Sequence, residues 1–296
     1  MLCYLNYKRV KKPLEVKDPW VEVGFGRGDF IVKLAKEHPE KTLIGFEISH
    51  LSVEKLLKRV KREGLKNVLC SRIDAYWGFY LLFRDGSVER VFMNYPDPWF
   101  KKRHHRRRLT TPERLYVFAK KLKTGGEIKI RSDEKAFLDF TLESAEQLGC
   151  FAYELERLSV SEPLTKYEQK WLSMGRELYQ LTLKKVKEPP FVEHPQIKEV
   201  EQLFPVKVKK GPVEQLENRT EKLADKVYLK TFKLWRGKEG YLLEALLSEE
   251  GYLQKFLISI RDKGEEFVVD VSPFSEVLKT ENLQRAVERV ARLIEG

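Results

Sequence analysis

Residues 20–47 read WVEVGFGRGDFIVKLAKEHPEKTLIGFE and contain, in order, an apolar run, a glycine turn, a helical pattern and a second apolar run. Glycines at 24, 26 and 28 allow the backbone to turn sharply and to approach a ligand closely. The apolar spacing over 30–36 predicts a helix, and 42–47 predicts the next strand. This order is the building unit of a parallel sheet, so the stretch predicts an α/β fold.

The same alternation continues to about Leu148. Further strands are predicted at 67–72, 88–94 and 127–132, and further helices at 49–64, 75–82, 112–122 and 133–149. Only a loop separates the extended runs 151–158 and 178–186, so we expect an antiparallel pair that closes one edge of the sheet. The predicted fold class is α/β, with a Rossmann-like sheet that is mostly parallel and has an antiparallel edge.

Residues 189–212 contain five prolines in 24 positions, which predicts a linker. Four strand candidates between 227 and 271 and a helix over 281–294 follow it. The predicted organisation is therefore a first domain over 1–188, a linker over 189–212, and a small α+β domain of unknown role over 213–296.

The net charge is +11 and the isoelectric point is near 9.3, which favours a polyanionic partner or an anionic membrane. Residues 1–189 hold 38 basic and 26 acidic side chains, whereas 190–296 hold 18 and 19, so the excess lies in the first part. No apolar run approaches the roughly 18 residues that a membrane span needs, and we expect a cytoplasmic protein without a membrane partner. The three cysteines and five histidines show no ligand spacing, so no disulfide framework and no metal site is expected.

Residues 94–110 read NYPDPWFKKRHHRRRLT and change character halfway along. Each proline restricts the residue before it, so Tyr95 and Asp97 should be extended and Asp97 should stand on a stiff turn. Residues 101–108 then hold six Lys or Arg and two His. A solvated loop is one interpretation of that run, but its fusion to the acidic turn at a strand end favours nucleic-acid binding.

Three carboxylates are associated with the ends of predicted strands. Glu22 opens the motif E-x-G-x-G-x-G, and Glu47 ends the second strand, where an acid can accept both hydroxyls of a ribose. Asp74 follows the third strand and is placed either to accept from an adenine amino group or to cap the next helix. The glycine loop with these acids predicts a nucleotide-like cofactor, although a tight turn and surface acids would give the same pattern.

With these features, the sequence resembles the bacterial tRNA (guanine-N7) methyltransferases, a class I S-adenosylmethionine-dependent family, over about 21–186. NYPDPWFKKRHHRRR and the TKYE of 165–168 are the specific marks. The resemblance implies that S-adenosylmethionine is held by Glu22, Gly24, Gly26, Gly28, Glu47, Asp74 and Asp97, and that Asp97 is also catalytic. It implies that the substrate tRNA is held by Lys101, Arg103, Arg106, Arg107, Arg108, Asp133, Thr165, Lys166, Tyr167 and Glu168. The part beyond Pro190 has no counterpart in the usual family pattern.

The chemistry agrees with these residues. Guanine N7 has an in-plane lone pair and no proton to lose, so its attack on a sulfonium methyl needs positioning rather than a strong base. The purine becomes cationic during transfer, and a carboxylate such as Asp97 or Glu168 that accepts from its N1–H and amino group would stabilise the transition state. Alternatively, Asp97 serves the turn, Asp133 caps a helix, and Thr165 and Glu168 belong to a polar loop.

The expected activity is methyl transfer to N7 of a guanine in tRNA, by resemblance the variable-loop guanine at position 46. Another RNA methyltransferase is the nearest alternative. A nicotinamide-dependent oxidoreductase would need a G-x-G-x-x-G turn and a hydride-handling residue, and a non-catalytic RNA-binding protein would leave the acids without purpose. The oligomeric state remains open.

Overall fold

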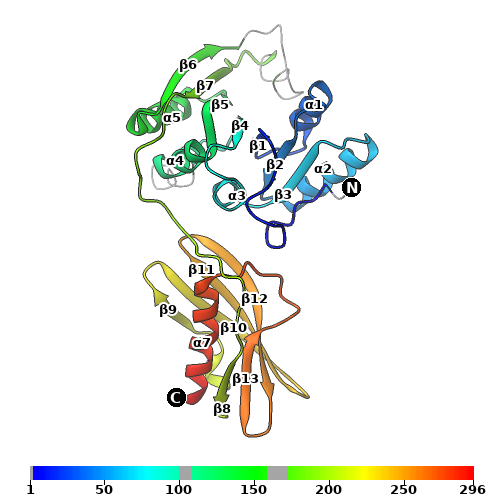
Figure 1. The fold of residues 1–296 in the computed structure, drawn as a ribbon, viewed down its shortest axis with the longest axis vertical. Coiled ribbons are helices and arrows are strands. Elements are labelled where there is room, and N and C mark those ends of the chain that lie inside the picture. Colours follow the sequence, from blue (N-terminus) through cyan, green and yellow to red (C-terminus); the bar gives the residue numbers. More distant parts are fainter. Residues whose placement is uncertain (1–2, 100–107, 159–167, 169–172) are drawn as a thin grey trace. The chain divides into compact units, whose positions relative to one another are not determined.

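The computed structural model describes residues 3–99, 108–158, 168 and 173–296, so the predictions for 101–107 and 165–167 lie outside the described residues. The chain forms two compact units, Met1–His194 and Pro195–Gly296 (Figure 1). The second unit begins within the predicted linker, because that range supplies a strand to its sheet.

The first unit contains a seven-stranded sheet in the order β3-β2-β1-β4-β5-β7-β6. The strands are β1 (Trp20–Val23), β2 (Leu43–Glu47), β3 (Val68–Arg72), β4 (Val88–Asn94), β5 (Leu122–Ser132), β6 (Phe151–Arg157) and β7 (Tyr179–Lys185). The first five strands pair in parallel, while β7 is antiparallel to both β5 and β6. The α/β prediction and its antiparallel edge are confirmed.

Within the described residues, five helices cover this sheet, namely α1 (Asp29–Glu37), α2 (His50–Arg62), α3 (Ala75–Leu82), α4 (Pro112–Lys121) and α5 (Lys135–Leu148). Figure 1 shows α1 and α2 on one face and α3, α4 and α5 on the other. The faces differ because the chain runs outward from β1 in one direction and from β4 in the other, and each crossover is right-handed. Strand β1, between β2 and β4, therefore marks the reversal where open α/β sheets bind ligands.

The largest boundary difference in this unit is at the start of β5, which was predicted at residue 127 and begins at Leu122. The helix before Gly125 and Gly126 was expected to reach residue 122, but α4 ends at Lys121 and β5 already starts at Leu122. The register between β4 and β5 shifts at this point, so both glycines lie inside an irregular strand start. Gly126 also packs closely, because a Cβ there would lie 2.8 Å from the Glu89 carbonyl oxygen.

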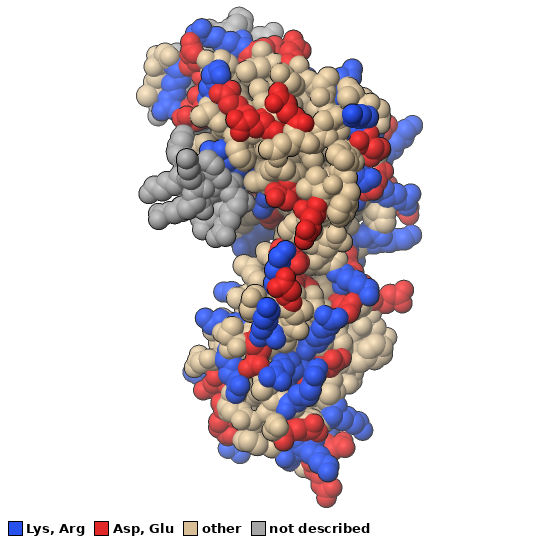
Figure 2. Space-filling model, turned by 90° about the vertical axis from the view of Figure 1, so that its left-hand side faces the viewer, with Lys and Arg blue, Asp and Glu red and all other residues tan. Residues whose placement is uncertain are grey.

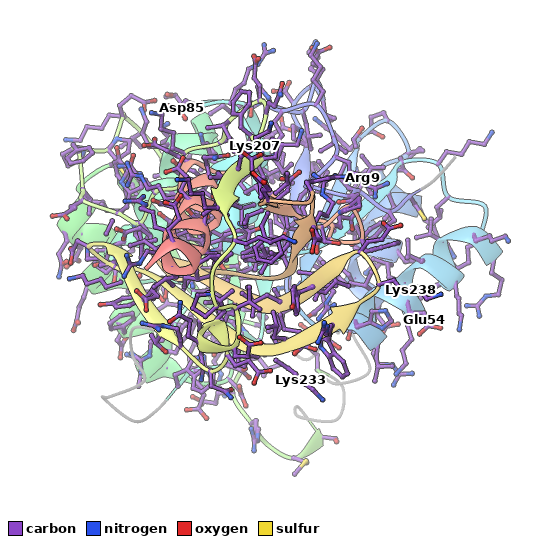
Figure 3. The ribbon with its side chains drawn as sticks, turned by 90° about the horizontal axis from the view of Figure 1, so that it is seen from below. Arg9, Glu54, Asp85, Lys207, Lys233 and Lys238 are labelled. Atoms are coloured by element: carbon purple, nitrogen blue, oxygen red, sulfur yellow. The ribbon has the colours of Figure 1, made fainter. Side chains whose placement is uncertain are left out.

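The second unit is a six-stranded antiparallel sheet in the order β8-β13-β12-β11-β10-β9. Its elements are β8 (Val206–Lys209), η2 (Glu214–Leu216), β9 (Thr220–Ala224), β10 (Val227–Gly237), β11 (Gly240–Glu249), β12 (Tyr252–Asp262), β13 (Glu266–Val271) and α7 (Glu281–Glu295). The sheet curves around α7 (Figure 3), and the apolar faces of both form one buried core. Strands β8 and β9 were not predicted, since both are short and rich in charge.

The surface of the second unit mixes charges of both signs. Figure 2 shows one of its faces, on which Lys and Arg side chains gather with Asp and Glu among them. The similar numbers of basic and acidic residues in this unit therefore do not exclude an excess of positive charge on one part of its surface.

Candidate active site

The glycine loop after β1 leaves open space beside its backbone. Gly24 and Gly26 have φ angles of 69° and 51°, and a Cβ on either would meet no atom within 4 Å. A ligand can therefore approach the backbone there, as predicted for a cofactor loop. Gly28 differs, because a Cβ there would lie 2.6 Å from Leu56 Cδ1, so its structural role is to let α2 pack against the loop.

Glu47 fixes the shape of this loop from the end of β2. Its Oε2 accepts a hydrogen bond from the Gly26 N–H at 3.0 Å, and its Oε1 accepts from Ile48 and Ser49 N–H groups at 2.8 and 3.0 Å. Three backbone donors orient the carboxylate, and Oε2, which accepts only one of these hydrogen bonds, retains a lone pair for a further donor. The sequence predicted the position of Glu47 but not its contact with Gly26.

Asp74 caps a helix, as one of its two predicted interpretations required. Its Oδ1 accepts from the Tyr76 N–H at 2.9 Å at the start of α3. The same oxygen accepts from Arg114 Nη1 at 2.9 Å. The helix cap is sufficient to explain why an acid stands at position 74, and it does not prevent Asp74 from also contacting a ligand.

Glu22 is a buried carboxyl group at the strand reversal, with 3% of its surface exposed. Its Oε1 accepts from Asn94 Nδ2 at 3.2 Å, whereas its Oε2 has no hydrogen-bond partner in the described part of the chain. Burial raises the pKa of Glu22 to about 8, although the Asn94 bond acts in the opposite direction. A cation next to Oε2 would stabilise the ionised form, so this group suits a positively charged ligand.

The turn after β4 departs from the predicted conformation. Tyr95 has a φ of 53°, so it lies in the left-handed region and is not extended. The prediction was wrong because tertiary contacts hold this residue: its N–H donates to the Arg131 carbonyl at 2.9 Å and its hydroxyl to Glu168 Oε1 at 2.8 Å. Such backbone strain costs on the order of 1–3 kcal/mol and is frequent at functional sites. Asp97, two residues later, is exposed.

Glu168 is the one residue of the TKYE motif that the structure describes, and it is buried at 2% exposure. Besides Tyr95, it accepts from Arg131 Nη1 at 3.2 Å. Arg131 in turn donates from Nε to Gln180 Oε1 at 2.8 Å. Burial first, and then the neighbouring Glu168, raise the pKa of Tyr95, so its hydroxyl remains a donor. These contacts join the turn after β4 to the antiparallel edge.

Sequence reasoning missed Asn94, Tyr95, Arg131 and Gln180. Asn94 and Tyr95 lie within the stretch that was singled out, and Arg131 lies near the end of a predicted strand, a position that could have marked it. Gln180 lies inside β7 and carries no comparable signal.

Arg108 was expected to touch RNA, but the structure buries it to 5% exposure. Its Nε donates to the Pro98 carbonyl at 2.8 Å, and its guanidinium lies 4.4 Å from the centre of the Phe140 ring. Burial lowers the pKa of Arg108. We therefore assign it to holding the turn of Asp97 and not to phosphate contact, because a planar guanidinium can stack on a ring and bond a carbonyl at once.

Asp133, predicted to hold substrate or to cap a helix, is mostly buried and forms an ion pair with Arg176. The Glu134 N–H at the start of α5 bonds instead to Ser132 Oγ at 3.0 Å. Asp133 is thus not the cap, and its ion pair links β5 to the segment that follows the TKYE motif.

Metal and membrane features are absent from the described part of the chain. No group of three or more His, Cys, Asp or Glu side chains there is arranged to hold a metal ion. No helix within the described ranges is long and apolar enough to cross a membrane.

The residues fit S-adenosylmethionine, which carries a ribose, an adenine, an ammonium and a sulfonium. The open glycine backbone, the oriented Glu47 carboxylate and the unpartnered Oε2 of buried Glu22 offer acceptors and space of the required kinds. A Rossmann-like sheet with this loop and an acidic turn at the end of β4 defines a class I methyltransferase. S-adenosylmethionine is the cofactor of this class.

The comparisons with known proteins identify the family. A family model described as "Putative methyltransferase" matches residues 17–181. The tRNA (guanine-N(7)-)-methyltransferase of Aquifex aeolicus is 64% identical over 296 residues, covering 99% of this chain and 100% of the relative. That of Thermus thermophilus is 30% identical over 277 residues, covering 93% of this chain and 88% of the relative. The chain belongs to the tRNA (guanine-N(7)-)-methyltransferase family.

Both relatives also align with most of the second unit. The family model ends at residue 181, which agrees with the expectation that the usual family pattern does not extend beyond Pro190, but these two relatives carry a counterpart of that part. Among solved structures, the 16S rRNA methyltransferase KamB superposes with a TM-score of 0.47 and 16% identity, covering 61% of this chain and 97% of that chain.

Proposed function

We propose that this protein transfers the methyl group of S-adenosylmethionine to N7 of a guanine in tRNA, and that the guanine is the variable-loop nucleotide at position 46. The observation that supports this activity most directly is that the glycine loop after β1 and the acidic turn at residues 96–98 after β4 lie at the same edge of the sheet. Full-length similarity to a tRNA (guanine-N(7)-)-methyltransferase supports the substrate. The position within tRNA rests on the family resemblance.

The cofactor supplies an electrophilic methyl group on a sulfonium. The roles proposed for the protein are binding and orientation: Glu47 accepts from the ribose hydroxyls, and the backbone of Gly24 and Gly26 lines the cofactor. Glu22 faces a cationic part of it, because its Oε2 is buried and unpartnered within the described residues. Asp74 is proposed to contact the adenine, although its Oδ1 already accepts the hydrogen bond that caps helix α3.

Asp97 is proposed as the catalytic residue. It is exposed on a turn whose two ends are fixed, at Tyr95 by Arg131 and Glu168, and at Pro98 by Arg108. A carboxylate held in place can accept from the guanine N1–H and amino group, which become stronger donors as N7 is alkylated. Glu168 is buried and bonded to Tyr95 and Arg131, so we assign it to positioning the turn rather than to direct contact with the base.

Residues 101–107 are proposed to contact the tRNA backbone through their Lys and Arg side chains. This role rests on sequence alone, as do the substrate roles of Lys101, Thr165, Lys166 and Tyr167. We also propose a cytoplasmic location, because tRNA is the proposed substrate.

The direct test is incubation of unmodified tRNA with the protein and labelled S-adenosylmethionine, followed by mapping of the methylated nucleoside. We expect 7-methylguanosine at a single variable-loop position. A different methylated nucleoside would refute the N7 chemistry, and 7-methylguanosine elsewhere in the tRNA would refute the position.

A further inference from the structure

Strand β10 of the second unit carries a pattern that the methyltransferase activity does not explain. Residues 226–238 read KVYLKTFKLWRGK and contain five basic residues, three aromatic residues and no acid. The second unit as a whole is balanced, with 18 basic and 18 acidic residues in 195–296. Positive charge is therefore concentrated on this strand.

Successive side chains of β10 alternate between the two faces of the sheet. Val227, Leu229 and Thr231 are buried at 4%, 0% and 1% exposure and face α7 and the core. Tyr228 and Trp235 are 42% and 48% exposed. Because Trp235 pairs with Leu242 and not with the buried Leu243, its indole lies on the face of the curved sheet turned away from α7. This face is called the outer face below.

The aromatic rings on the outer face are accompanied by cations. Lys233 Nζ lies 3.9 Å from the centre of the Trp235 ring, and Lys230 Nζ lies 5.2 Å from the centre of the Phe232 ring. Trp235 Nε1 donates to Glu244 Oε1 at 3.0 Å, which fixes the plane of the indole. Lys233 extends from β10 on the side away from α7 (Figure 3).

The neighbouring strands extend this surface. Register places Lys255 and Arg261 of β12 on the outer face, since their partners Leu246 and Gly240 alternate with the buried residues of β11. Phe274, 85% exposed, lines two adjoining hollows. One is bounded by Trp235, Arg236 and Arg261 together with Glu239 and Asp270, and the other by Phe232 and Lys255 together with Glu244 and Glu276. The larger hollow measures about 590 Å³.

We propose that the outer face of the second unit is an RNA-binding surface on which unpaired bases of the tRNA substrate stack against Trp235 and Phe274. Exposed aromatic rings flanked by Lys and Arg match the chemistry of single-stranded RNA, whose bases stack while basic side chains neutralise phosphates. A second copy of this chain would meet the same excess of positive charge on β10, which disfavours self-association through this strand. The proposal rests on the proposed function, because it takes tRNA as the substrate.

The experiment uses the full chain and measures two quantities separately: the equilibrium dissociation constant for labelled tRNA, and the methylation rate at saturating tRNA. The variants are Trp235→Ala, Trp235→Phe and Phe274→Ala. Phe204→Ala is the matched control, because Phe204 is also an exposed aromatic residue of this unit, but its backbone bonds to Gln284 of α7. Thermal unfolding of each variant checks that the second unit remains folded.

Loss of one base–aromatic stack should raise the dissociation constant about fivefold or more for Trp235→Ala. Trp235→Phe should retain most of the affinity, Phe204→Ala should leave it unchanged, and the rate at saturation should stay within about twofold of the wild-type value because the active site is untouched. Lys233→Gln should flatten the slope of log affinity against log salt by up to about 0.9.

An unchanged tRNA affinity in both folded alanine variants would overturn the proposal. So would sedimentation showing that Trp235→Ala converts a dimer into a monomer without altering tRNA affinity, since the face would then join copies of the chain. Failure of the wild-type protein to methylate guanine would refute the proposed function instead, and it would leave the binding comparison intact.

Discussion

Replacing the buried Glu22 by Gln should remove a loss of stability between about pH 5.5 and about pH 7.5. An ordinary carboxyl group, with a pKa near 4.5, would not cause such a loss. The native pKa is about 8 and the ordinary value is 4.5, so between these two values the native state holds a proton that the unfolded state has released. The unfolded state then binds fewer protons, and stability decreases as pH rises through this window. Gln keeps an amide oxygen that can accept from Asn94 but does not titrate.

The magnitude follows from the width of the window. A shift of one pKa unit corresponds to about 1.4 kcal/mol, so the wild-type protein should lose about 2.5 kcal/mol relative to Glu22→Gln between about pH 5.5 and about pH 7.5. For a unit of this size that loss corresponds to roughly 5–10 °C in melting temperature. Because the second unit is identical in both proteins, its contribution cancels in the comparison.

The assay is denaturant unfolding of both proteins at closely spaced pH values, with Glu89→Gln as the matched control. Burial alone would raise the pKa of Glu89, but hydrogen bonds from Lys41, Trp20 and Lys123 lower it to about 2. Its contribution is present above the ordinary value of 4.5 and is lost only as pH falls toward 2. Glu89→Gln retains Glu22, so it should lose stability with rising pH as the wild-type protein does, and the difference between the two should stay constant across the window.

Adding S-adenosylmethionine sharpens the test. A cation next to Glu22 Oε2 would lower the pKa of the bound form, so the pH dependence of the wild-type protein should flatten and binding should release a proton. If the wild-type and Glu22→Gln proteins differ by a constant amount from about pH 5.5 to about pH 7.5, the assignment of a protonated buried Glu22 is wrong.

Three further substitutions separate the other roles. Asp97→Ala should abolish turnover while cofactor binding survives, and single-turnover methylation within a few-fold of wild type would contradict its catalytic role. Glu47→Ala should weaken S-adenosylmethionine by roughly 1.5–3 kcal/mol in calorimetry, the range for hydrogen bonds to a charged group, and an unchanged dissociation constant would mean that the ribose lies elsewhere. Arg108→Ala should lower the unfolding free energy and leave the salt slope of tRNA binding unchanged, whereas replacing Arg106 and Arg107 together should flatten that slope by roughly 1.4–1.8 units. A flattening of the slope by about 0.7–0.9 units for Arg108→Ala would restore its predicted RNA contact.

The local sequence was sufficient for most elements of the first unit. Alternating apolar patterns and the glycine turn act over a few residues, and the structure has the corresponding strands and helices. The antiparallel edge also followed from sequence, since only a loop was expected between its two runs. The two strands missed in the second unit, β8 and β9, are four and five residues long; β8 alternates over only two apolar residues, and β9 has no apolar alternation.

The sequence by itself determined the α/β class, the glycine loop and the acids near the strand ends. Tertiary structure alone decided which side chains meet: Asn94 reaches Glu22 across 72 positions, and Tyr95 reaches Glu168 across 73. It also decided that Arg108, in a run of identical charges, turns inward to Pro98 and Phe140. The reason is physical: hydrophobic periodicity is a property of neighbouring residues, whereas burial, hydrogen bonding and backbone strain depend on which strands the crossovers bring together.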